Sequence, residues 1–413
     1  MNAEKLWTKD FIIIAGVNFF THVVFYMMMV ITAVYAMNAF GADRGTAGLA
    51  TGIFVLASLV GRIFTGKYMD RAGHKRMLVL GAALFAVSMA LHLFINSLAM
   101  LFVLRILQGT AHGVTTTAAG AIAANIIPDK RRGEGTGYYA TAMNVAMAIG
   151  PFLSIYLYSH AGFFHIFMAG LVFIVFDLLL ALVLKAPAQP QKTEPAAAQK
   201  RGIAVRDFIE PKAVPVSLVM FLITVAYASL MSFLSPYAEE IGLVEAASYF
   251  FFVYALALLA TRPFTGKWFD LYGAKKVTYP FIFLLAGGFA VLGAAGNAAV
   301  FLLAGALIGI GYGTVLSYLQ AIAVQQSPAD KKGLATSTFF IFLDLANGIG
   351  AYVIGLAVGA LRFRTVYLLC GLFITLGALA FHFVYGRSGE KAGRRRTAGR
   401  LAEAGEARFS QKK

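Results

Sequence analysis

The sequence predicts an all-α membrane protein in which twelve transmembrane helices form two six-helix bundles. Two observations carry this prediction. The first is composition: 59% of the 413 residues are apolar and only 13% are charged, with a mean hydropathy of +0.75, far from the averages of soluble domains. The second is an internal repeat with a constant offset of 200 residues, which predicts pseudo-two-fold symmetry between the halves.

Twelve apolar segments are long enough to cross the hydrocarbon layer, which takes about 20 helical residues. They are continuously apolar and lack the alternation of barrel strands, so we expect helices. The predicted spans are 11–37, 46–63, 77–94, 99–124, 135–158, 163–184, 214–237, 247–262, 277–293, 298–325, 333–359 and 365–385. The first is too long for the apolar region of a signal peptide and has no clean cleavage site, so we expect it to be retained.

The repeat is clearest between the segments 66–76 and 266–276, which lie after the second and eighth predicted spans. The basic pair Arg131-Arg132 recurs as Lys331-Lys332. The same offset relates Gly109 to Gly309, Gly113 to Gly313, Pro128 to Pro328, Gly133 to Gly333, Asn144 to Asp344 and Gly150 to Gly350. So many positions in one register indicate a duplicated unit.

The distribution of basic residues predicts the orientation. Thirty of the 35 Lys and Arg residues fall in 1–10, 64–76, 128–134, 185–213, 262–276, 326–332 and 386–413, which share one side of the membrane. Arg44, Arg362 and Arg364 fall on the other side, and Arg62 and Arg105 lie within spans. The positive-inside rule therefore places both termini in the cytoplasm. The net charge of +16 is then a signal of topology, and we expect no nucleic-acid partner.

These features divide the chain into five segments: a cytoplasmic N-terminus (1–10), a first bundle (11–184), a cytoplasmic linker (185–213), a second bundle (214–385) and a basic tail (386–413). The linker contains four prolines and the tail has few apolar residues, so we expect a flexible connector and a disordered end. Cys370 is the only cysteine, which excludes a disulfide framework and a cysteine metal cluster. We expect no metal and no cofactor, a lipid bilayer as surroundings, and a monomer in the cell membrane.

The first loop segment resembles the pattern G-x3-D-[RK]-x-G-x-[RK]-[RK] of the major facilitator superfamily at every fixed position. These positions are Gly66, Asp70, Arg71, Gly73, Lys75 and Arg76. The second copy keeps Gly266, Asp270 and Gly273 but has Leu271 in place of a basic residue. We expect Gly66 and Gly73 to permit a tight turn between helices. The resemblance implies a charged latch that stabilises the outward-open state; the alternative is that Asp70 only caps a helix and the cations only fix topology.

Two shorter patterns extend this resemblance. The stretch from Arg105 to Gly109 is similar to the R-x-x-Q-G signature of the fourth helix, which implies a part for Arg105 in proton handling. An arginine at this depth must face a cavity or a partner, or else snorkel to the interface. Gly150-Pro151 resembles the end of the antiporter signature of the fifth helix, although Ala146 and Ser154 stand where glycine is commonest. The resemblance is therefore to the twelve-helix drug or metabolite:proton antiporters.

Polar residues form two helical stripes that need something to face. They are Arg105, Gln108, His112, Thr115 and Thr116 in the fourth span, and Asn18, His22 and Tyr26 in the first. In this family helices one, four, seven and ten surround the central cavity, so the resemblance places His22 and His112 at opposite walls. Tyr227 and Tyr312, from the seventh and tenth spans, are weaker candidates. Histidine can exchange protons near neutral pH; the alternative is a hydrogen bond between helices without a role in transport.

Two acidic residues, Asp344 and Asp177, lie well inside predicted spans. A carboxylate there is costly unless it is protonated, paired or hydrated. Asp344 stands about 16 Å along its helix from Gly333, on a helix that lines the gates in this family. It is the first candidate for a proton carrier, with Asp177 second because the sixth helix usually packs at the periphery. The family's drug exporters often have an acid in helix one or four, which this chain lacks.

The function that these patterns favour is alternating-access transport in which inward proton movement drives export of a small organic molecule. Three alternatives stay open. An importer or facilitator of a sugar, amino acid or organic anion would use Arg105, His22 and His112 as substrate ligands. The protein could also export a dedicated metabolite such as a metal-chelating siderophore, or serve as a membrane sensor or scaffold that transports nothing. We find no P-loop, and no nucleophile and general base at the spacing of a known catalytic motif, so we do not expect an enzyme.

Overall fold

The computed structural model describes residues 6–128, 131–185, 209–272, 274–328 and 331–384. In these ranges all secondary structure is helical, and twelve helices are long and apolar enough to cross a membrane, as the sequence predicts. The first half contains α1 (Lys9–Phe40), α2 (Arg44–Ala72), α3 (His74–Leu91), the short 3-10 helix η1 (His92–Phe94), α4 (Leu98–Ile126), α5 (Arg132–Ala161) and α6 (Phe163–Val183). The second contains α7 (Val214–Glu240), α8 (Val244–Tyr272), α9 (Ala274–Gly293), α10 (Ala298–Gln326), α11 (Lys332–Ala360) and a last helix, Phe363–Val384.

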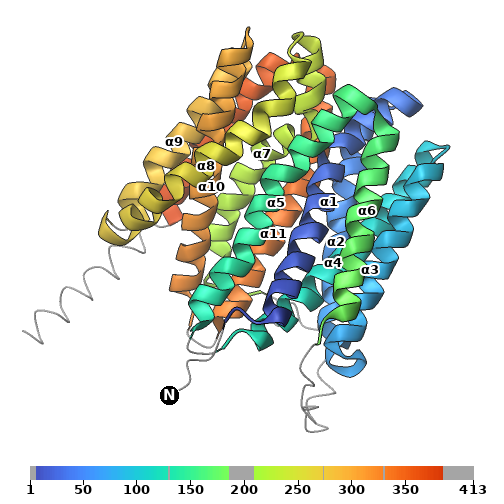
Figure 1. Cartoon of the computed structure of the whole chain (residues 1–413). Coiled ribbons are helices and arrows are strands. Elements are labelled where there is room, and N and C mark those ends of the chain that lie inside the picture. The colour runs from blue at the N-terminus through green and yellow to red at the C-terminus, as the bar shows by residue number, and fades with distance from the viewer. Residues whose placement is uncertain (1–5, 129–130, 186–208, 273, 329–330, 385–413) are drawn as a thin grey trace, which may run out of the picture.

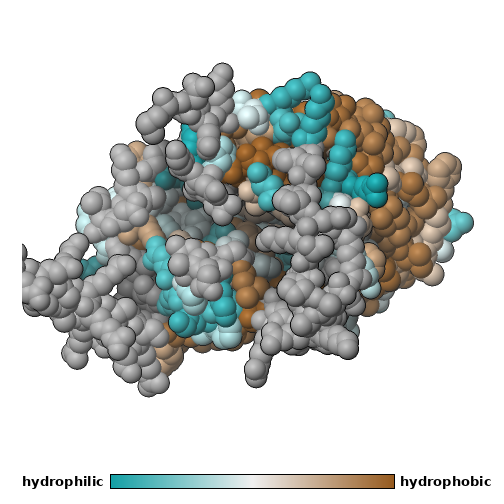
Figure 2. Space-filling view, turned by 90° about the horizontal axis from the view of Figure 1, so that it is seen from below, coloured by the Kyte–Doolittle hydropathy of each residue, from teal (hydrophilic) through white to brown (hydrophobic). Residues whose placement is uncertain are grey.

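The two halves form neighbouring bundles of tilted helices, coloured blue to green and yellow to red in Figure 1. The end of the molecule that holds Thr8, Gly73 and Pro128 carries the predicted basic segments and is called here the basic end. The opposite end holds Gly41, Asp43 and Asn297. Figure 2 views the basic end, where hydrophilic residues gather toward the middle and one flank is strongly hydrophobic. The predicted tail (386–413) and most of the linker (185–213) lie outside the described residues.

Polar caps fix where several helices begin, because a side-chain oxygen satisfies one of the free N–H groups of the first turn. Ser97 accepts a hydrogen bond from Met100 N (3.3 Å) at the start of α4. Asn297, 200 positions later, accepts one from Val300 N (3.0 Å) at the start of α10. The repeat therefore places the same kind of cap at the same point of both halves.

The repeat also places equivalent glycines where helices touch. A Cβ at Gly109 of α4 would lie 2.0 Å from the carbonyl oxygen of Phe54 in α2. At Gly309 of α10 it would lie 2.3 Å from the carbonyl oxygen of Tyr254 in α8. Small residues allow membrane helices to pack backbone to backbone. The pairs α2–α4 and α8–α10 therefore use one packing mode, which is the predicted pseudo-symmetry at residue level.

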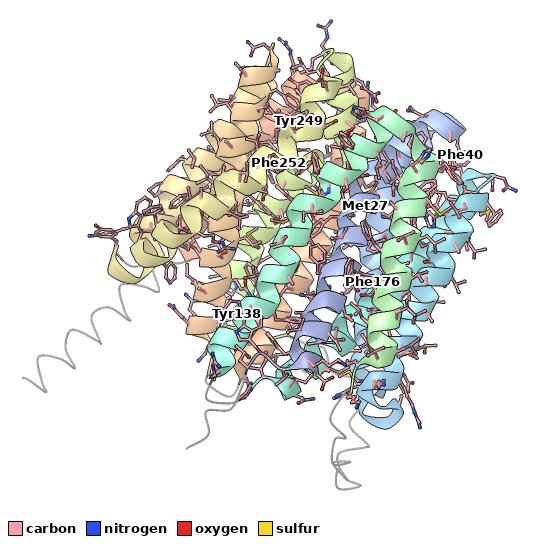
Figure 3. All side chains as sticks on the ribbon, viewed as in Figure 1. Met27, Phe40, Tyr138, Phe176, Tyr249 and Phe252 are labelled. Carbon is pink, nitrogen blue, oxygen red and sulfur yellow. The ribbon has the colours of Figure 1, made fainter. Side chains whose placement is uncertain are left out.

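The two halves meet most closely in the part of the interface nearer the opposite end. A Cβ at Gly48 of α2 would lie 2.2 Å from the carbonyl oxygen of Ala351 in α11, and one at Gly52 would lie 2.1 Å from that of Gly348. The neighbouring contact between α5 and α8 is aromatic: Phe152 lies 5.8 Å from Phe252, between ring centroids, and Phe252 is seen beside α5 in Figure 3. These contacts close the opposite end.

Arg44 strengthens this closure from the first turn of α2. Its Nη1 donates a hydrogen bond to the carbonyl oxygen of Val358 in α11 (2.7 Å), and its guanidinium lies 4.7 Å from the ring centroid of Phe363. Its Nη2 lies 3.8 Å from a carboxylate oxygen of Glu240 in α7. One side chain of the first half therefore holds three elements of the second.

One prediction about the first loop is wrong. Gly66 was expected to help the chain turn, but α2 continues through it to Ala72, and nothing lies within 4 Å of a Cβ built there. The turn falls on Gly73 alone, whose φ of 88° suits glycine. Segment 64–76 is mostly helix because favourable helical residues follow Gly66 without a proline.

Candidate functional site

A cavity of about 350 Å³ lies between the two halves. Its lining runs from the middle of the bundle, near Met29 and Met231, to Ala124 and Ile127 at the basic end of α4. The described lining includes Asn18, His22, Phe25, Tyr26, Arg62, His112, Thr116, Tyr139 and Met143 from the first half, and Tyr227, Tyr312, Leu316, Gln320, Thr336, Phe340, Leu343, Asp344 and Asn347 from the second. With the opposite end closed, the cavity is approached from the basic end.

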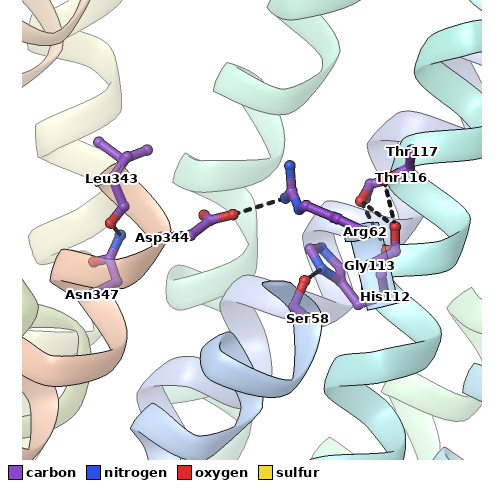
Figure 4. A network of polar contacts seen from close by, with 9 residues as sticks. All are labelled: Ser58, Arg62, His112, Gly113, Thr116, Thr117, Leu343, Asp344 and Asn347. Carbon is purple, nitrogen blue, oxygen red and sulfur yellow. Dashed lines mark hydrogen bonds and ion pairs between the residues drawn. The ribbon is translucent and has the colours of Figure 1, made fainter. Parts of the chain in front are cut away.

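An ion pair crosses this cavity between the halves. Arg62 Nη2 of α2 lies 3.0 Å from Asp344 Oδ2 of α11, and Figure 4 shows the two side chains pointing toward each other. The Arg62 side chain is 27% exposed and that of Asp344 15%, so both charges are largely removed from water. An acid at this depth was expected to be protonated, paired or hydrated, and here it is paired.

Two histidines form part of the wall contributed by the first half. The rings of His22 and His112 are 5.5 Å apart, between centroids. Nδ1 of His22 donates to the carbonyl oxygen of Asn18 (2.8 Å), and Nδ1 of His112 hydrogen-bonds to the hydroxyl of Ser58 (3.0 Å). The prediction that these residues face each other from opposite walls is therefore wrong: α1 and α4 belong to one bundle, which brings the rings side by side.

The wall contributed by the second half is aromatic and amide-bearing. The rings of Tyr227 and Tyr312 are stacked at 3.6 Å with an interplanar angle of 5°, and the Tyr312 hydroxyl lies 3.3 Å from the Thr224 hydroxyl. Asn347 donates to the carbonyl oxygen of Leu343 (3.1 Å), while its Oδ1 is buried without a partner among the described residues. The two tyrosines predicted from α7 and α10 thus meet at the cavity.

Three residues of the predicted stripe on α4 are absent from the described cavity lining: Arg105, Gln108 and Thr115. Arg105 is fully buried, donates to the carbonyl oxygen of Ala50 (3.3 Å) and to Gln108 Oε1, and lies 4.4 Å from the ring centroid of Phe54. It neither snorkels to the interface nor faces the cavity. The stripe is longer than the cavity, so its part that contains Arg105 and Gln108 packs inside the first half, where Arg105 contacts Ala50 and Phe54 of α2.

Asp177 lies outside the cavity lining, between α6 and α1. Its carboxylate accepts a hydrogen bond from the Thr21 hydroxyl (3.1 Å), and its Oδ2 is buried without a partner among the described residues. The side chain is fully buried. This position agrees with the expectation that the sixth helix packs at the periphery.

The predicted gate residues fall into two groups. Gly150 of α5 allows close approach to α1, since a Cβ there would lie 2.7 Å from Tyr26 Cβ. Ser154 of α5 donates a hydrogen bond to the carbonyl oxygen of Met27 in α1 (2.9 Å), and Pro151 lies buried inside α5. In the first loop Lys75 donates to the carbonyl oxygen of Leu182 (3.0 Å), within its own half, and Arg76 is exposed. The side chains of Asp70, Arg71 and Asp270 lie outside what the structure describes, as does Gly273, whereas Gly266 lies within α8.

Sequence reasoning missed the cavity role of Arg62, which it had only counted as a charge within a span. One signal was present: Arg262 stands 200 positions later, so an arginine recurs at one depth of α2 and α8. Arg262 donates to the Ser317 hydroxyl of α10 (2.7 Å) inside the second half. Asn144 stands where the second half has Asp344, so the repeat does not supply Arg262 with a carboxylate at the position equivalent to Asp344.

Comparison with known proteins identifies the family. A sequence profile of the Major Facilitator Superfamily matches residues 14–253 and 216–410. The chain belongs to the major facilitator superfamily. An MFS-type transporter of Methanocaldococcus jannaschii is 24% identical over 391 residues, covering 92% of this chain and 97% of the relative. The staphylopine export protein of Staphylococcus aureus is 21% identical over 350 residues, covering 81% and 86%.

The same fold appears in a bacterial homologue of the human lysosomal transporter Spinster, solved in an inward-facing, unoccupied conformation. The TM-score is 0.73 at 14% sequence identity, with 93% of this chain and 98% of that chain covered. The superfamily and fold are those of membrane transporters, so this chain is a multi-pass membrane transporter. Its central cavity lies between the two bundles, where transporters of repeated architecture bind their substrates.

Proposed function

We propose that this transporter exports a small organic molecule by alternating access, in exchange for protons. The observation that carries the proposal is the Arg62–Asp344 ion pair, 3.0 Å long, which joins the two halves across the central cavity. A carboxylate in this position links protonation to conformation, because neutralising it removes an attraction between the bundles. The export activity named for the staphylococcal relative supports the direction.

The basic end is proposed to face the cytoplasm, with both termini, because nearly all Lys and Arg residues of the loops lie there. The structure then corresponds to an inward-open conformation, with the external end closed by the α2–α11 glycines and Arg44. The segment from Gly66 to Arg76 is proposed to latch the cytoplasmic end in the other conformation. We further propose that the protein acts as a monomer in the cell membrane and performs no chemical reaction.

Asp344 is proposed as the proton carrier. Deprotonated Asp344 pairs with Arg62 in the inward-open conformation, and a proton arriving from outside removes that pair. Losing one partner costs about 1 kcal/mol or less for an exposed pair and about 3–5 kcal/mol for a buried one. The partial exposure of both side chains places this pair between these limits. Proton binding is therefore favoured in the outward-open conformation and release in the inward-open one.

The remaining predicted proton groups have supporting roles in this scheme. His22 and His112 line the cavity within reach of the substrate, and both are proposed to take up or pass protons there. Arg105 acts from inside the first half, by holding α2 and α4 in the geometry that presents Arg62. Asp177 is the second candidate carrier, placed after Asp344 because it does not line the cavity. One proton moving through about 100 mV supplies roughly 2.3 kcal/mol, more than a tenfold solute gradient at about 1.4 kcal/mol per decade.

The test is accumulation of a panel of small amphipathic molecules in inverted membrane vesicles, with and without an uncoupler. We expect energised vesicles to accumulate at least one compound and to lose it when the uncoupler is added. Asp344→Asn should abolish accumulation but keep downhill exchange of the same compound, because the conformational cycle remains while its proton link is lost. Accumulation that ignores the uncoupler, or an Asp344→Asn variant that accumulates like the parent, would refute the proposal.

A further inference from the structure

The charges of the cavity are balanced and divided between its two walls. Among the described lining residues, Arg62 and Asp344 are the only arginine, lysine or acidic residues, one from each half. A ligand with a single positive or negative charge would bring an uncompensated charge into a largely desolvated space, which is costly. An uncharged ligand would leave the Arg62–Asp344 ion pair intact and make no contact with either charge. A ligand that carries both signs keeps the cavity neutral and meets both walls.

Each member of the ion pair has unused hydrogen-bonding capacity. The recorded contact joins one guanidinium nitrogen to one carboxylate oxygen, while Arg62 Nε is buried without a partner among the described residues. Guanidinium has five N–H donors and a carboxylate about four acceptor sites. A ligand can therefore bind Arg62 through a carboxylate, in the two-pronged geometry that arginine favours, and Asp344 through an ammonium group.

A second unpartnered polar atom stands beside each charge. Ser58, one turn from Arg62 on α2, holds His112, whose Nε2 is buried without a partner in the described chain. Asn347, one turn from Asp344 on α11, has its Oδ1 buried without a partner as well. Figure 4 shows these groups on the two sides of the Arg62–Asp344 contact. The amide oxygen of Asn347 is an acceptor that suits an ammonium group, so the Asp344 side forms the cation-binding pole.

The remaining wall suits a flat apolar body. Tyr227 and Tyr312 form a parallel stack, and Phe25 stacks on His112 with ring centroids 4.8 Å apart. From the two charged poles and this aromatic wall we infer that the transported molecule is a zwitterion, with a carboxylate and a protonated amine carried on an aromatic or apolar body. This inference rests on the proposed function and adds the substrate class. The ammonium group of the substrate and the proton compete for Asp344. Exchange requires this competition, because substrate and proton must not be bound at the same time.

The inference is tested by equilibrium binding to the purified protein, without any gradient. Isothermal titration calorimetry compares matched sets: phenylalanine, phenethylamine and 3-phenylpropionate, and the three naphthyl counterparts. We expect the zwitterion of at least one set to bind about tenfold or more tightly than both its single-charge analogues, since each analogue lacks one charge-assisted contact. An amine or an acid that binds as tightly as the zwitterion, or no binding by any member of either set, would overturn the inference.

Substitutions at the two poles give a crossed result that general damage cannot imitate. Arg62→Gln should remove the preference for the zwitterion over the amine, and Asp344→Asn should remove its preference over the acid. Arg62→Lys should retain part of the first preference. Arg362→Gln and Glu245→Gln, exposed charges outside the cavity lining, are the matched controls and should bind all ligands like the parent. Preferences that survive both pole substitutions would contradict the assignment.

The outcome separates this inference from the proposed function. Selective zwitterion binding with transport that ignores protons would keep the inference and refute proton exchange. Proton-driven export of amines alone, with no zwitterion preference, would keep the proposed function and refute the inference.

Discussion

Closing the opposite end depends on glycine at position 52, and Gly52→Ala tests this dependence. An alanine Cβ there would lie 2.1 Å from the carbonyl oxygen of Gly348, whereas ordinary van der Waals contact begins near 3.4 Å. The helices α2 and α11 must then separate by about 1.3 Å locally, because the obstacle is backbone and cannot rotate away. The variant should therefore disfavour the conformation in which this end is closed.

The magnitude follows from the cost of overpacking. Inserting one methyl group into a close-packed contact costs about 1–3 kcal/mol, and that range corresponds to roughly a 5–150-fold change in an equilibrium constant. The clash exists only while the two helices are in contact, so nearly all of this cost falls on the conformation seen here. The ratio of basic-end-open to opposite-end-open molecules should fall by that factor.

A cysteine at Gln320, which lines the cavity on α10, reports this ratio in a Cys370→Ala background. We expect an impermeant maleimide added at the basic end to label Gln320→Cys more slowly when Gly52→Ala is present, in proportion to the fall in the fraction of basic-end-open molecules. Gly359→Ala is the matched control: it lies on α11 with nothing within 4 Å of the added Cβ, and labelling should stay at the parent rate. Equal rates in Gly52→Ala and Gly359→Ala would refute the reasoning.

Three further predictions follow from the described contacts. Arg44→Ala should raise opposite-end opening by about tenfold or more, since it removes a charge-assisted hydrogen bond worth about 1.5–3 kcal/mol. Arg362→Ala, exposed at the same end, should not raise it, and cysteine accessibility measures both. Ser97→Ala and Asn297→Ala should each lower the free energy of unfolding by about 1 kcal/mol, the usual value of a helix N-cap. Thermal unfolding in detergent measures this loss, and destabilisation by only one of the two substitutions would contradict the equivalence of the two caps. Asp177→Asn should keep uncoupler-sensitive accumulation in vesicles, because this side chain lies outside the cavity lining; loss of accumulation in a folded variant would move the proton site to α6.

Much of the fold could be predicted because the bilayer imposes it. Any continuous apolar segment of this length must be helical and must satisfy its own backbone, so the twelve spans follow from composition. The glycine repeat also carried packing information: Gly109 and Gly309 mark the same helix contact in both halves. The C-terminal end of α2 could not be predicted from the sequence, since Gly66 does not show whether the helix stops before it or continues through it to Gly73.

The site could be predicted only in part, because the cavity depends on how the two halves face each other. The stripe on α4 was identified, but a sequence does not show how much of its length the cavity covers, so Gln108 and Thr115 were assigned to the cavity although neither lines it. Arg105 faces a partner, which was one of the expected alternatives. His22 and His112 were separated because the order of helices around the cavity was considered without the pairing of helices inside a bundle. Arg62 was missed because its partner lies on another bundle, at a distance that only the assembled geometry supplies.

The central claim is that protonation of Asp344 closes the cavity at the basic end and opens it at the opposite end. Spin labels at Asn96→Cys and Ala294→Cys, on loops of the two halves at the opposite end, measure that movement by electron–electron resonance in a Cys370→Ala background. We predict that lowering the pH lengthens this distance in the parent, and that Asp344→Asn favours the long distance to the same extent at every pH while still sampling the short one. Identical distances at high and low pH in the parent, or an Asp344→Asn variant that responds to pH like the parent, would contradict the account.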